Sequence, residues 1–313
     1  MSCTIIRPKD HTAWLEARTQ GIGSSEVGTI LGLNPFETPL QLWQRKRGIT
    51  APQEENFAMK AGHYLEDAVS RFYADETGAH IIKNSTGDWI AVSNEKPYMR
   101  VSPDRLFWSP GTRHSMAARG ILECKTTQLT IDADDLPKHW FCQLQYQLHV
   151  TGLKHGALAW LTQGRTFGQR AFAYDAEFCA FICERIDEFW QKNIIEGEKP
   201  DPINTADVLL LYPTQTDGKT VQADEETAGA WYELKEMKEE MKEIKAKADQ
   251  LEEQIKLRMQ DAEALVDGAR TLCTWRSSGE TVKFCAEALK QDAPEVYSRY
   301  TRRQPGTRRF LIK

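Results

Sequence analysis

Ser102-Pro103-Asp104, followed after a short insertion by Glu123-Cys124-Lys125, is the pair of stretches that decides the expected fold. Each stretch adjoins a short apolar run bounded by turn residues, which is typical of a strand. Successive side chains of a strand point to opposite faces, so Glu123 and Lys125 should share one face while Cys124 points to the other. A neighbouring strand carrying Asp104 would then bring two carboxylates and one ammonium group together.

This cluster of charges suggests metal-assisted chemistry on a phosphodiester. Hard oxygen ligands suit Mg²⁺ or Mn²⁺, which bind through one or two carboxylates together with a substrate phosphate. Lys125 could orient the attacking water, help to deprotonate it, or offset charge on the transition-state phosphate. The plainer interpretation is that Asp104 begins a turn and that Glu123 and Lys125 are an ordinary same-face pair.

Outward from the motif, the chain reads as a mixed α/β protein. Apolar residues recur at helical spacing over residues 57–77, 140–150 and 177–195, and three shorter helices should lie between residues 10 and 48. Strands are expected at residues 89–93, 98–101, 105–108, 121–125, 157–161 and 167–174, with the first four in one sheet. The predicted fold class is therefore a mixed central sheet flanked by helices, with a helical C-terminal arm.

The predicted domains are a core over residues 1–199, a linker over 200–228, a coiled-coil-like helix over 229–267 and a small α/β tail over 268–313. The linker is rich in Pro, Thr and Asp. In the helix, apolar residues recur at alternating steps of three and four, which favours contact with another chain. A solvated helix that packs on its own body is the alternative. The tail should hold strands at 271–275 and 282–284, a short helix near Val296 and a final extended run at 308–312.

Composition excludes some classes of protein. The 313 residues include 41% hydrophobic and 27% charged residues, and no window is apolar for long enough to span a membrane. The N-terminus lacks the pattern of a secretory signal, and seven cysteines without paired spacing suit a reducing cytoplasm, so we expect a cytoplasmic protein without disulfides. The net charge of −5 does not by itself indicate nucleic-acid binding. A positively charged binding face can nevertheless be present on a protein whose total charge is negative.

Three further stretches give the motif a context. One carries Glu66 on the helix upstream of the sheet, and another carries Gln143 on the helix directly downstream. The third contains Arg18 and the string Gly-Ile-Gly-Ser-Ser-Glu-Val-Gly at residues 21–28. Ser24 and Ser25 fall where a helix N-terminus would present free amides, which is a favourable place for a phosphate. Simple N-capping by a serine is the alternative.

With these stretches in this order, residues 10–195 resemble the YqaJ-like viral recombinase family. That family is related to the bacteriophage lambda exonuclease within the PD-(D/E)xK nucleases, whose core is restriction-endonuclease-like. The resemblance implies a homotrimeric ring that degrades one strand of duplex DNA from its 5′ end, with two Mg²⁺ ions per site, Mn²⁺ as a substitute, and a single-strand annealing protein as partner.

The resemblance also implies residue roles. It makes Asp104, Glu123 and the main-chain carbonyl of Cys124 metal ligands, with Glu66 close to the metals. Lys125 would be the catalytic lysine and Gln143 the downstream glutamine of the site. The residues that match positions holding the 5′-terminal phosphate are Arg18, Ser25 and Ser102.

Two rival functions remain at this point. A nicking or structure-specific endonuclease would carry the same motif, because the motif does not set polarity. A DNA-end-binding scaffold is the second rival, although intact acidic residues and lysine argue against it. Near the C-terminus, aromatic and basic residues gather in a possible phosphate-contact patch or a merely exposed tail: Tyr300, Arg302, Arg303, Arg308 and Arg309.

Overall fold

The computed structural model describes residues 3–51, 56–82, 89–304 and 306–312. The chain divides into two units, Met1–Leu211 and Tyr212–Lys313. The boundary falls inside the segment that the sequence suggested as a linker.

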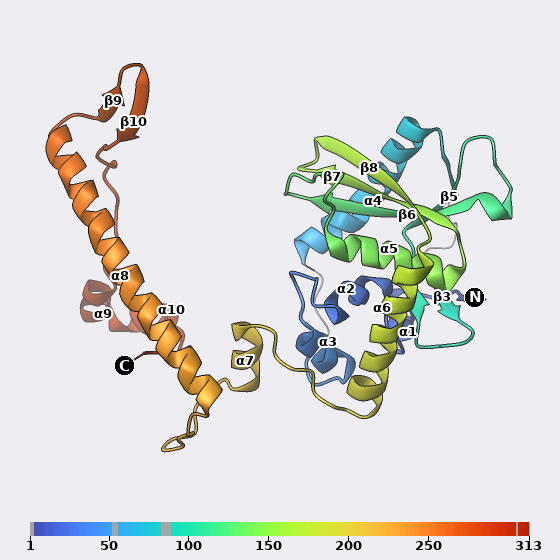
Figure 1. The fold of residues 1–313 in the computed structure, drawn as a ribbon, viewed down its shortest axis with the longest axis horizontal. Helices are drawn as coiled ribbons and strands as arrows, with labels where there is room; N and C mark the ends of the chain where they lie inside the picture. The colour runs from blue at the N-terminus through green and yellow to red at the C-terminus, as the bar shows by residue number, and fades with distance from the viewer. Residues whose placement is uncertain (1–2, 52–55, 83–88, 305, 313) are drawn as a thin grey trace. The chain divides into compact units, whose positions relative to one another are not determined.

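A five-stranded mixed sheet forms the centre of the first unit (Figure 1). Its order is β2 (His80–Ile82), β5 (Arg105–Trp108), β6 (Arg119–Thr127), β7 (His155–Thr162) and β8 (Thr166–Ala173). Only β6 and β7 run parallel, and helix α5 (Lys138–Thr151) makes the crossover between them. Strand β7 is a nearly continuous apolar run, and β6 is buried from Gly120 to Cys124, because both faces of the sheet are covered there.

Two helices cover the sheet from opposite sides. Helix α4 (Phe57–Thr77) packs Val69 and Tyr73 against Leu122 of β6, and α5 packs Leu144 against Ile121, the neighbouring residue in the strand. The alternation predicted for β6 is therefore present, with odd-numbered side chains facing α5. Helix α4 begins after Asn56, whose side chain accepts the Met59 N–H, and ends at Gly78 with a positive φ of 68°. The mixed α/β class is confirmed.

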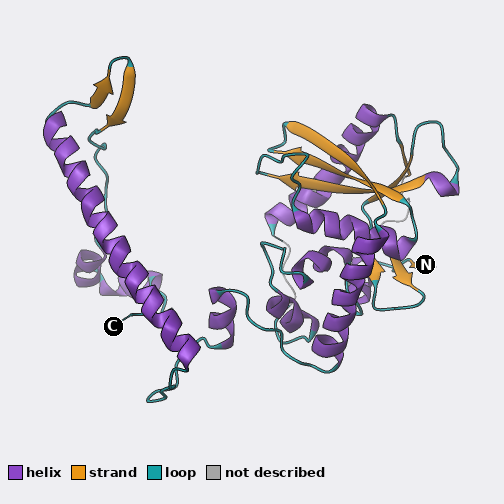
Figure 2. Ribbon diagram, in the orientation of Figure 1, coloured by secondary structure: helices purple, strands orange, loops and turns teal. Residues whose placement is uncertain are grey.

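The prediction that residues 89–93 and 98–101 belong to the same sheet as the motif strands is wrong. Strands β3 (Ile90–Ser93) and β4 (Arg100–Val101) pair with β1 (Cys3–Ile6) in a separate three-stranded sheet (Figure 2). The ladder cannot continue from β4 into β5 because Pro103 has no N–H to donate. At that point the side chain of Asp104, in place of a strand backbone, takes the N–H of Cys124.

Short helices precede the sheet, as the sequence predicted. Helix α1 (His11–Thr19) is capped by Asp10, and α3 (Pro39–Lys46) begins with a capping box between Thr38 and Gln41. Between them lie a 3₁₀ turn at Ser24–Glu26 and α2 (Val27–Ile30). The N-capping interpretation of the serines is wrong, because Ser24 and Ser25 lie inside the 3₁₀ turn and neither caps it through its side chain.

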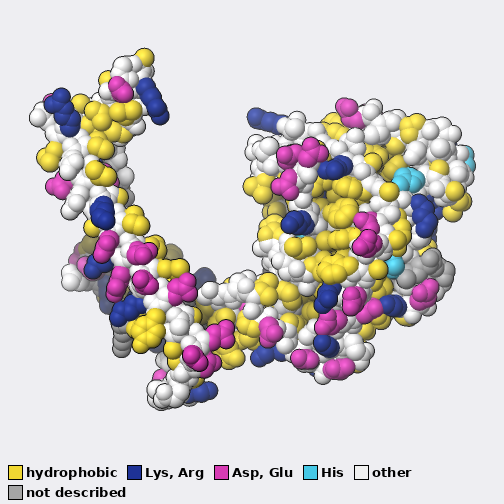
Figure 3. Space-filling view, in the orientation of Figure 1, with side chains coloured by type: hydrophobic (Ala, Val, Ile, Leu, Met, Phe, Trp, Pro, Cys, Tyr) yellow, Lys and Arg dark blue, Asp and Glu magenta, His cyan; other side chains and the backbone are white. Residues whose placement is uncertain are grey.

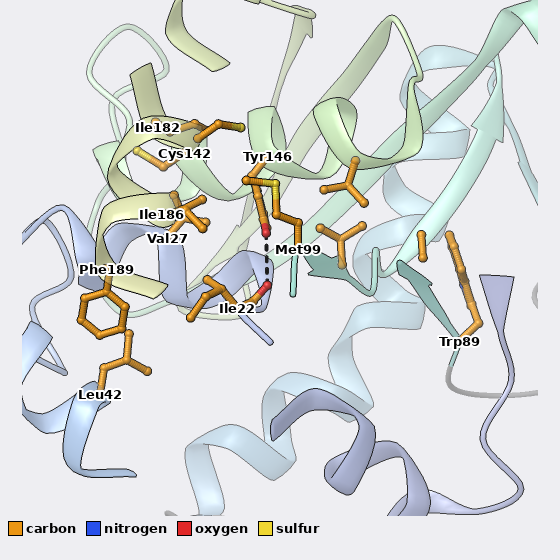
Figure 4. Packing of buried hydrophobic residues seen from close by; sticks show 14 residues of the cluster. Ile22, Val27, Leu42, Trp89, Met99, Cys142, Tyr146, Ile182, Ile186 and Phe189 are labelled. Carbon is orange, nitrogen blue, oxygen red and sulfur yellow. Dashed lines mark hydrogen bonds between the residues drawn. The ribbon is translucent and has the colours of Figure 1, made fainter. Parts of the chain in front are cut away.

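A shared apolar core holds these helices against α5 (Figure 4). Ile22, Met99 and Tyr146 meet there, and the Tyr146 hydroxyl donates to the Ile22 carbonyl at 3.2 Å. Gly28 is required for this packing, since a Cβ at that position would lie 2.5 Å from the Cβ of His139. The 3₁₀ turn is therefore held directly against the helix that follows the motif strand.

The first unit extends further than the predicted core. Helix α6 (Ala176–Glu188) continues as a π-helical segment (Phe189–Ile195), and α7 (Thr205–Leu211) lies in the expected linker. Asp207 of α7 is fully buried, and its carboxylate accepts from the Thr38 hydroxyl at 2.7 Å and from the Ile203 N–H at 3.1 Å. A buried hydrogen-bonded carboxylate of this kind ties α7 to α3.

The second unit is built on α8 (Glu225–Met259), followed by the hairpin of β9 (Ala264–Asp267) and β10 (Arg270–Thr274) and by α9 (Ala286–Asp292) and α10 (Pro294–Tyr300). The long helix ends eight residues earlier than expected, since residues 264–267 form a strand. Met259 is buried there against Cys273. Residues 282–284 and 308–312 are not strands. Of the helices in the described ranges, none has the length and apolar character needed to cross a bilayer.

Candidate active site

Strand β6 presents Glu123 and Lys125 side by side toward α5. The Lys125 ammonium donates to Glu123 Oε1 at 2.7 Å and to Gln143 Oε1 at 2.9 Å. Gln143 in turn donates through Nε2 to Glu123 Oε1 at 2.5 Å. Burial lowers the pKa of Lys125, but the charges of Glu123 and Asp104 outweigh it and leave the pKa raised. Lys125 is therefore positively charged at neutral pH, and its two hydrogen bonds fix the position of its ammonium group.

Asp104 reaches the same site from the end of the neighbouring strand. Its Oδ2 accepts the Cys124 N–H at 2.7 Å. The N–H and C=O of one strand residue point to the same edge, so the Cys124 carbonyl also faces the Asp104 side. Burial, followed by the charges of Glu123 and Glu66, raises the pKa of Asp104 well above its ordinary value. This carboxylate lacks enough positive charge around it.

Glu66 approaches from α4. Its carboxylate lies 3.6 Å from Arg105, and burial raises its pKa against the opposing effect of Arg105. The sequence offered no role for Arg105, which also donates to the Asp104 carbonyl at 2.7 Å. Arg105 thus lies between two of the predicted acidic residues.

The predicted phosphate-binding residues line the same cavity as the charged cluster. Arg18 donates to the Ser25 hydroxyl at 3.2 Å, and its guanidinium lies 4.5 Å from the Trp14 ring centre. The Ser102 hydroxyl is turned inward, since it donates to the Trp89 carbonyl at 2.6 Å. The cavity has a volume of about 1130 Å³ and is lined by all of these predicted residues: Arg18, Ser25, Glu66, Ser102, Asp104, Glu123, Cys124, Lys125 and Gln143.

The donor set suits a hard cation. Among the residues that the structure describes, no group of three or more His, Cys, Asp and Glu side chains is arranged to hold a metal ion by itself. Asp104 and Glu123 nevertheless share one cavity with a raised carboxyl pKa at Asp104, and a bound cation would relieve that imbalance. These two carboxylates and the Cys124 carbonyl, all oxygen donors, are the residues that would hold Mg²⁺ or Mn²⁺.

Comparison with known families agrees with this geometry. Residues 13–154, from α1 to the residue before β7, match the family model described as a YqaJ-like viral recombinase domain. The resemblance inferred from the motifs is thereby confirmed.

The individual proteins that resemble this chain share less than 30% of its residues. The uncharacterised protein YqaJ of Bacillus subtilis strain 168 is 27% identical over 311 residues, which cover 96% of this chain and 93% of that protein. Among solved structures, an alkaline exonuclease from Laribacter hongkongensis superposes with a TM-score of 0.46 at 17% identity, covering 59% of this chain and 93% of its own. A phage-related exonuclease from Haemophilus somnus 129PT gives 0.39 at 14% identity, with coverages of 57% and 96%.

The matched region, residues 13–154, also contains a buried residue that the sequence motifs did not single out. Gln147 is fully buried on α5, and its Nε2 donates both to Glu123 Oε2 at 2.8 Å and to the Ser24 hydroxyl at 3.2 Å. Gln147 therefore connects the motif strand with the turn that carries Ser25. The only signal in the sequence was its position four residues after Gln143, which places both glutamines on one helix face.

Glu26 anchors the turn that carries Ser24 and Ser25. Its buried carboxylate accepts the Gly23 N–H at 2.8 Å and pairs with Lys46 at 2.8 Å and with Arg45 at 3.1 Å. Burial by itself raises the pKa of Glu26, but the charges of Lys46 and Arg45 outweigh burial and leave the pKa below its ordinary value. The turn thus rests on an ionised carboxylate.

Replacing Glu26 should therefore destabilise the first unit in a pH-dependent way. We expect Glu26→Gln to lower the free energy of unfolding at pH 7 by about 3–5 kcal/mol, because Lys46 is left buried without its counter-charge. Since the folded-state pKa is lowered, this stabilisation is present above the ordinary glutamate pKa and is lost as pH falls through the folded value. Denaturant unfolding from pH 7 down to about pH 2.5 should show the two proteins converging below the ordinary glutamate pKa.

The matched control is Glu188→Gln, which removes an exposed carboxylate that pairs with Arg185 and Lys192. It should change stability little at any pH. A difference between wild type and Glu26→Gln that stays constant down to about pH 2.5 would show that the folded-state pKa of Glu26 is not lowered.

Proposed function

We propose that this chain is a metal-dependent 5′ to 3′ exodeoxyribonuclease that degrades one strand of linear duplex DNA to mononucleotides. The observation that carries the proposal is one cavity that contains both the Asp104–Glu123–Lys125 cluster and the Arg18–Ser25 pair. The first group suits phosphodiester hydrolysis, and the second suits a terminal phosphate. The family match to a viral recombinase domain supports a role on DNA.

Different residues of the cavity bind the DNA end and assist the hydrolysis. Arg18 and Ser25 bind the 5′-phosphate and so fix which end of the strand enters. Lys125, held by Glu123 and Gln143, orients the attacking water and offsets negative charge on the phosphate under attack. When bound at Asp104 and Glu123, Mg²⁺ supplies Lewis-acid polarisation of the phosphodiester and lowers the pKa of water. We propose two such ions per site, with Mn²⁺ able to replace Mg²⁺.

Binding of one strand end without reading bases also implies weak sequence specificity. We further propose that three copies form a closed ring around the duplex, which would keep the enzyme on its substrate between cuts. In this role the enzyme exposes single strands for an annealing protein, in phage-type recombination within the cytoplasm of a bacterial host.

Digestion of labelled DNA tests the proposal. With Mg²⁺, linear duplex carrying a 5′ label should release labelled mononucleotide at once, whereas a 3′ label should stay in long products until late. Chelation of the metal should stop release. Covalently closed circular duplex should stay intact, and its rapid cutting would favour the endonuclease instead. Early release of the 3′ label would reverse the proposed polarity, and DNA binding without any release would leave only an end-binding scaffold.

A further inference from the structure

Helix α8 exposes a continuous apolar stripe on a 35-residue helix. Its large apolar side chains keep between 36% and 68% of their surface exposed within the chain: Leu234, Met237, Met241, Ile244, Leu251 and Ile255. With Ala248 they follow steps of three and four residues, which are the a and d positions of a heptad. A helix that long gains little by keeping such a stripe in water, so the stripe implies a partner helix.

The charged residues beside the stripe indicate which partner. In a parallel, in-register pair, each g residue faces the e residue five positions later on the other helix. Here the g residues are Glu233, Glu240 and Lys247, and the facing e residues of a second copy are Lys238, Lys245 and Glu252. All three pairs have opposite charges, so a second copy of this same helix is the complementary surface. In Figure 3, charged and apolar side chains alternate along α8.

The antiparallel alternative fits less well. If Met241 faced Ile244 of the other copy, Lys245 would lie near Lys238 of that copy, which is a pair of like charges that the parallel register avoids. The contacts that these side chains make within the chain are weak competitors. Glu252 pairs with Lys256 and Lys238 lies 6.0 Å from the Phe310 ring centre, both at the surface, where such contacts contribute little.

We propose that α8 is a self-assembly element that pairs in parallel and in register with α8 of a second copy of this chain. The pairing goes beyond the nuclease proposal and does not depend on it. In a ring of three copies, the same parallel and in-register contacts would join three α8 helices around the threefold axis instead of two.

Disulfide cross-linking of the full-length chain tests the geometry independently of contacts elsewhere. Residue 244 is a d position, so in the proposed arrangement its side chains from two copies face each other. Ile244→Cys should cross-link between chains under mild oxidation, well above the background from the native cysteines in wild type. The matched control, Lys242→Cys, lies at the outward b position and should stay at background. Equal cross-linking of the two variants would overturn the proposal.

Charge reversal tests the pairing direction. Glu240→Lys and Lys245→Glu should each reduce cross-linking of the Ile244→Cys chain by about tenfold, since each places like charges in every symmetry-related pair. The double variant should restore it, because the two charges are exchanged across the interface. Failure of the double variant to restore cross-linking would contradict the parallel register. Digestion of short linear duplex by these same proteins reports on the nuclease proposal separately.

Discussion

Glu123→Gln, Asp104→Asn and Lys125→Met should each lower the rate of nucleotide release by about 10³-fold, as expected when a group that holds the metal or stabilises the transition state is removed. These near-isosteric changes are preferable to alanine, because the Asp104 side chain also accepts the Cys124 N–H and an asparagine oxygen can keep that bond. Single-turnover digestion of linear duplex with Mg²⁺ measures the effect.

Two comparisons separate loss of chemistry from loss of folding. Asp134→Asn removes a carboxylate that is 96% exposed and should digest DNA at the wild-type rate. Thermal unfolding should show all four variants folded, and calorimetry should show weaker metal binding for the two carboxylate variants but not for Lys125→Met. Near-wild-type turnover in any of the three site variants would reject the site.

Arg18→Ala should abolish the preference for 5′-phosphorylated ends. We expect the wild-type protein to digest phosphorylated linear duplex about 10- to 100-fold faster than duplex with 5′-hydroxyl ends, since a hydrogen bond to a charged group contributes about 1.5–3 kcal/mol. The variant should digest both substrates at the slower rate. Initial rates on paired substrates that differ only in the terminal phosphate measure this ratio.

The neighbouring serines refine this expectation. Ser25→Ala removes a direct partner of Arg18 and should reduce the preference in part. Ser102→Ala should have a smaller effect, because its hydroxyl hydrogen is already donated to the Trp89 carbonyl. Arg185→Ala, on α6, serves as the control for loss of one positive charge. A preference that survives in Arg18→Ala would place the phosphate pocket elsewhere.

The sequence predicted elements well where local signals were strong. Helix α4 has the predicted bounds because Gly78 stops it in a left-handed conformation, and β6 alternates as expected because both of its faces are packed. The division of the strands into two sheets could not be predicted. It depends on β1 pairing with β3 across more than eighty residues, and no local pattern encodes such a partner.

In the candidate site as well, residues placed by a local sequence pattern were predicted, whereas residues placed by contacts between distant segments were not. Alternation along one strand was enough to place Lys125 beside Glu123. The serine string was misinterpreted because the 3₁₀ turn begins after Gly23, whose N–H is accepted by Glu26, and the counter-charges of Glu26 come from α3. Gln147 was missed because its importance comes from bonding two elements that are distant in sequence.

The bond pattern of Gln147 also has a consequence for how this protein can change during evolution. Almost one hundred residues separate Ser24 from Glu123 along the chain, including the surface segment around Met116, which is 64% exposed. Because one buried amide touches both residues, the spacing between the turn proposed to bind the DNA end and the motif strand does not depend on the length of the chain between them. Insertions in that segment should therefore be tolerated without altering how many nucleotides lie between a bound end and the cut.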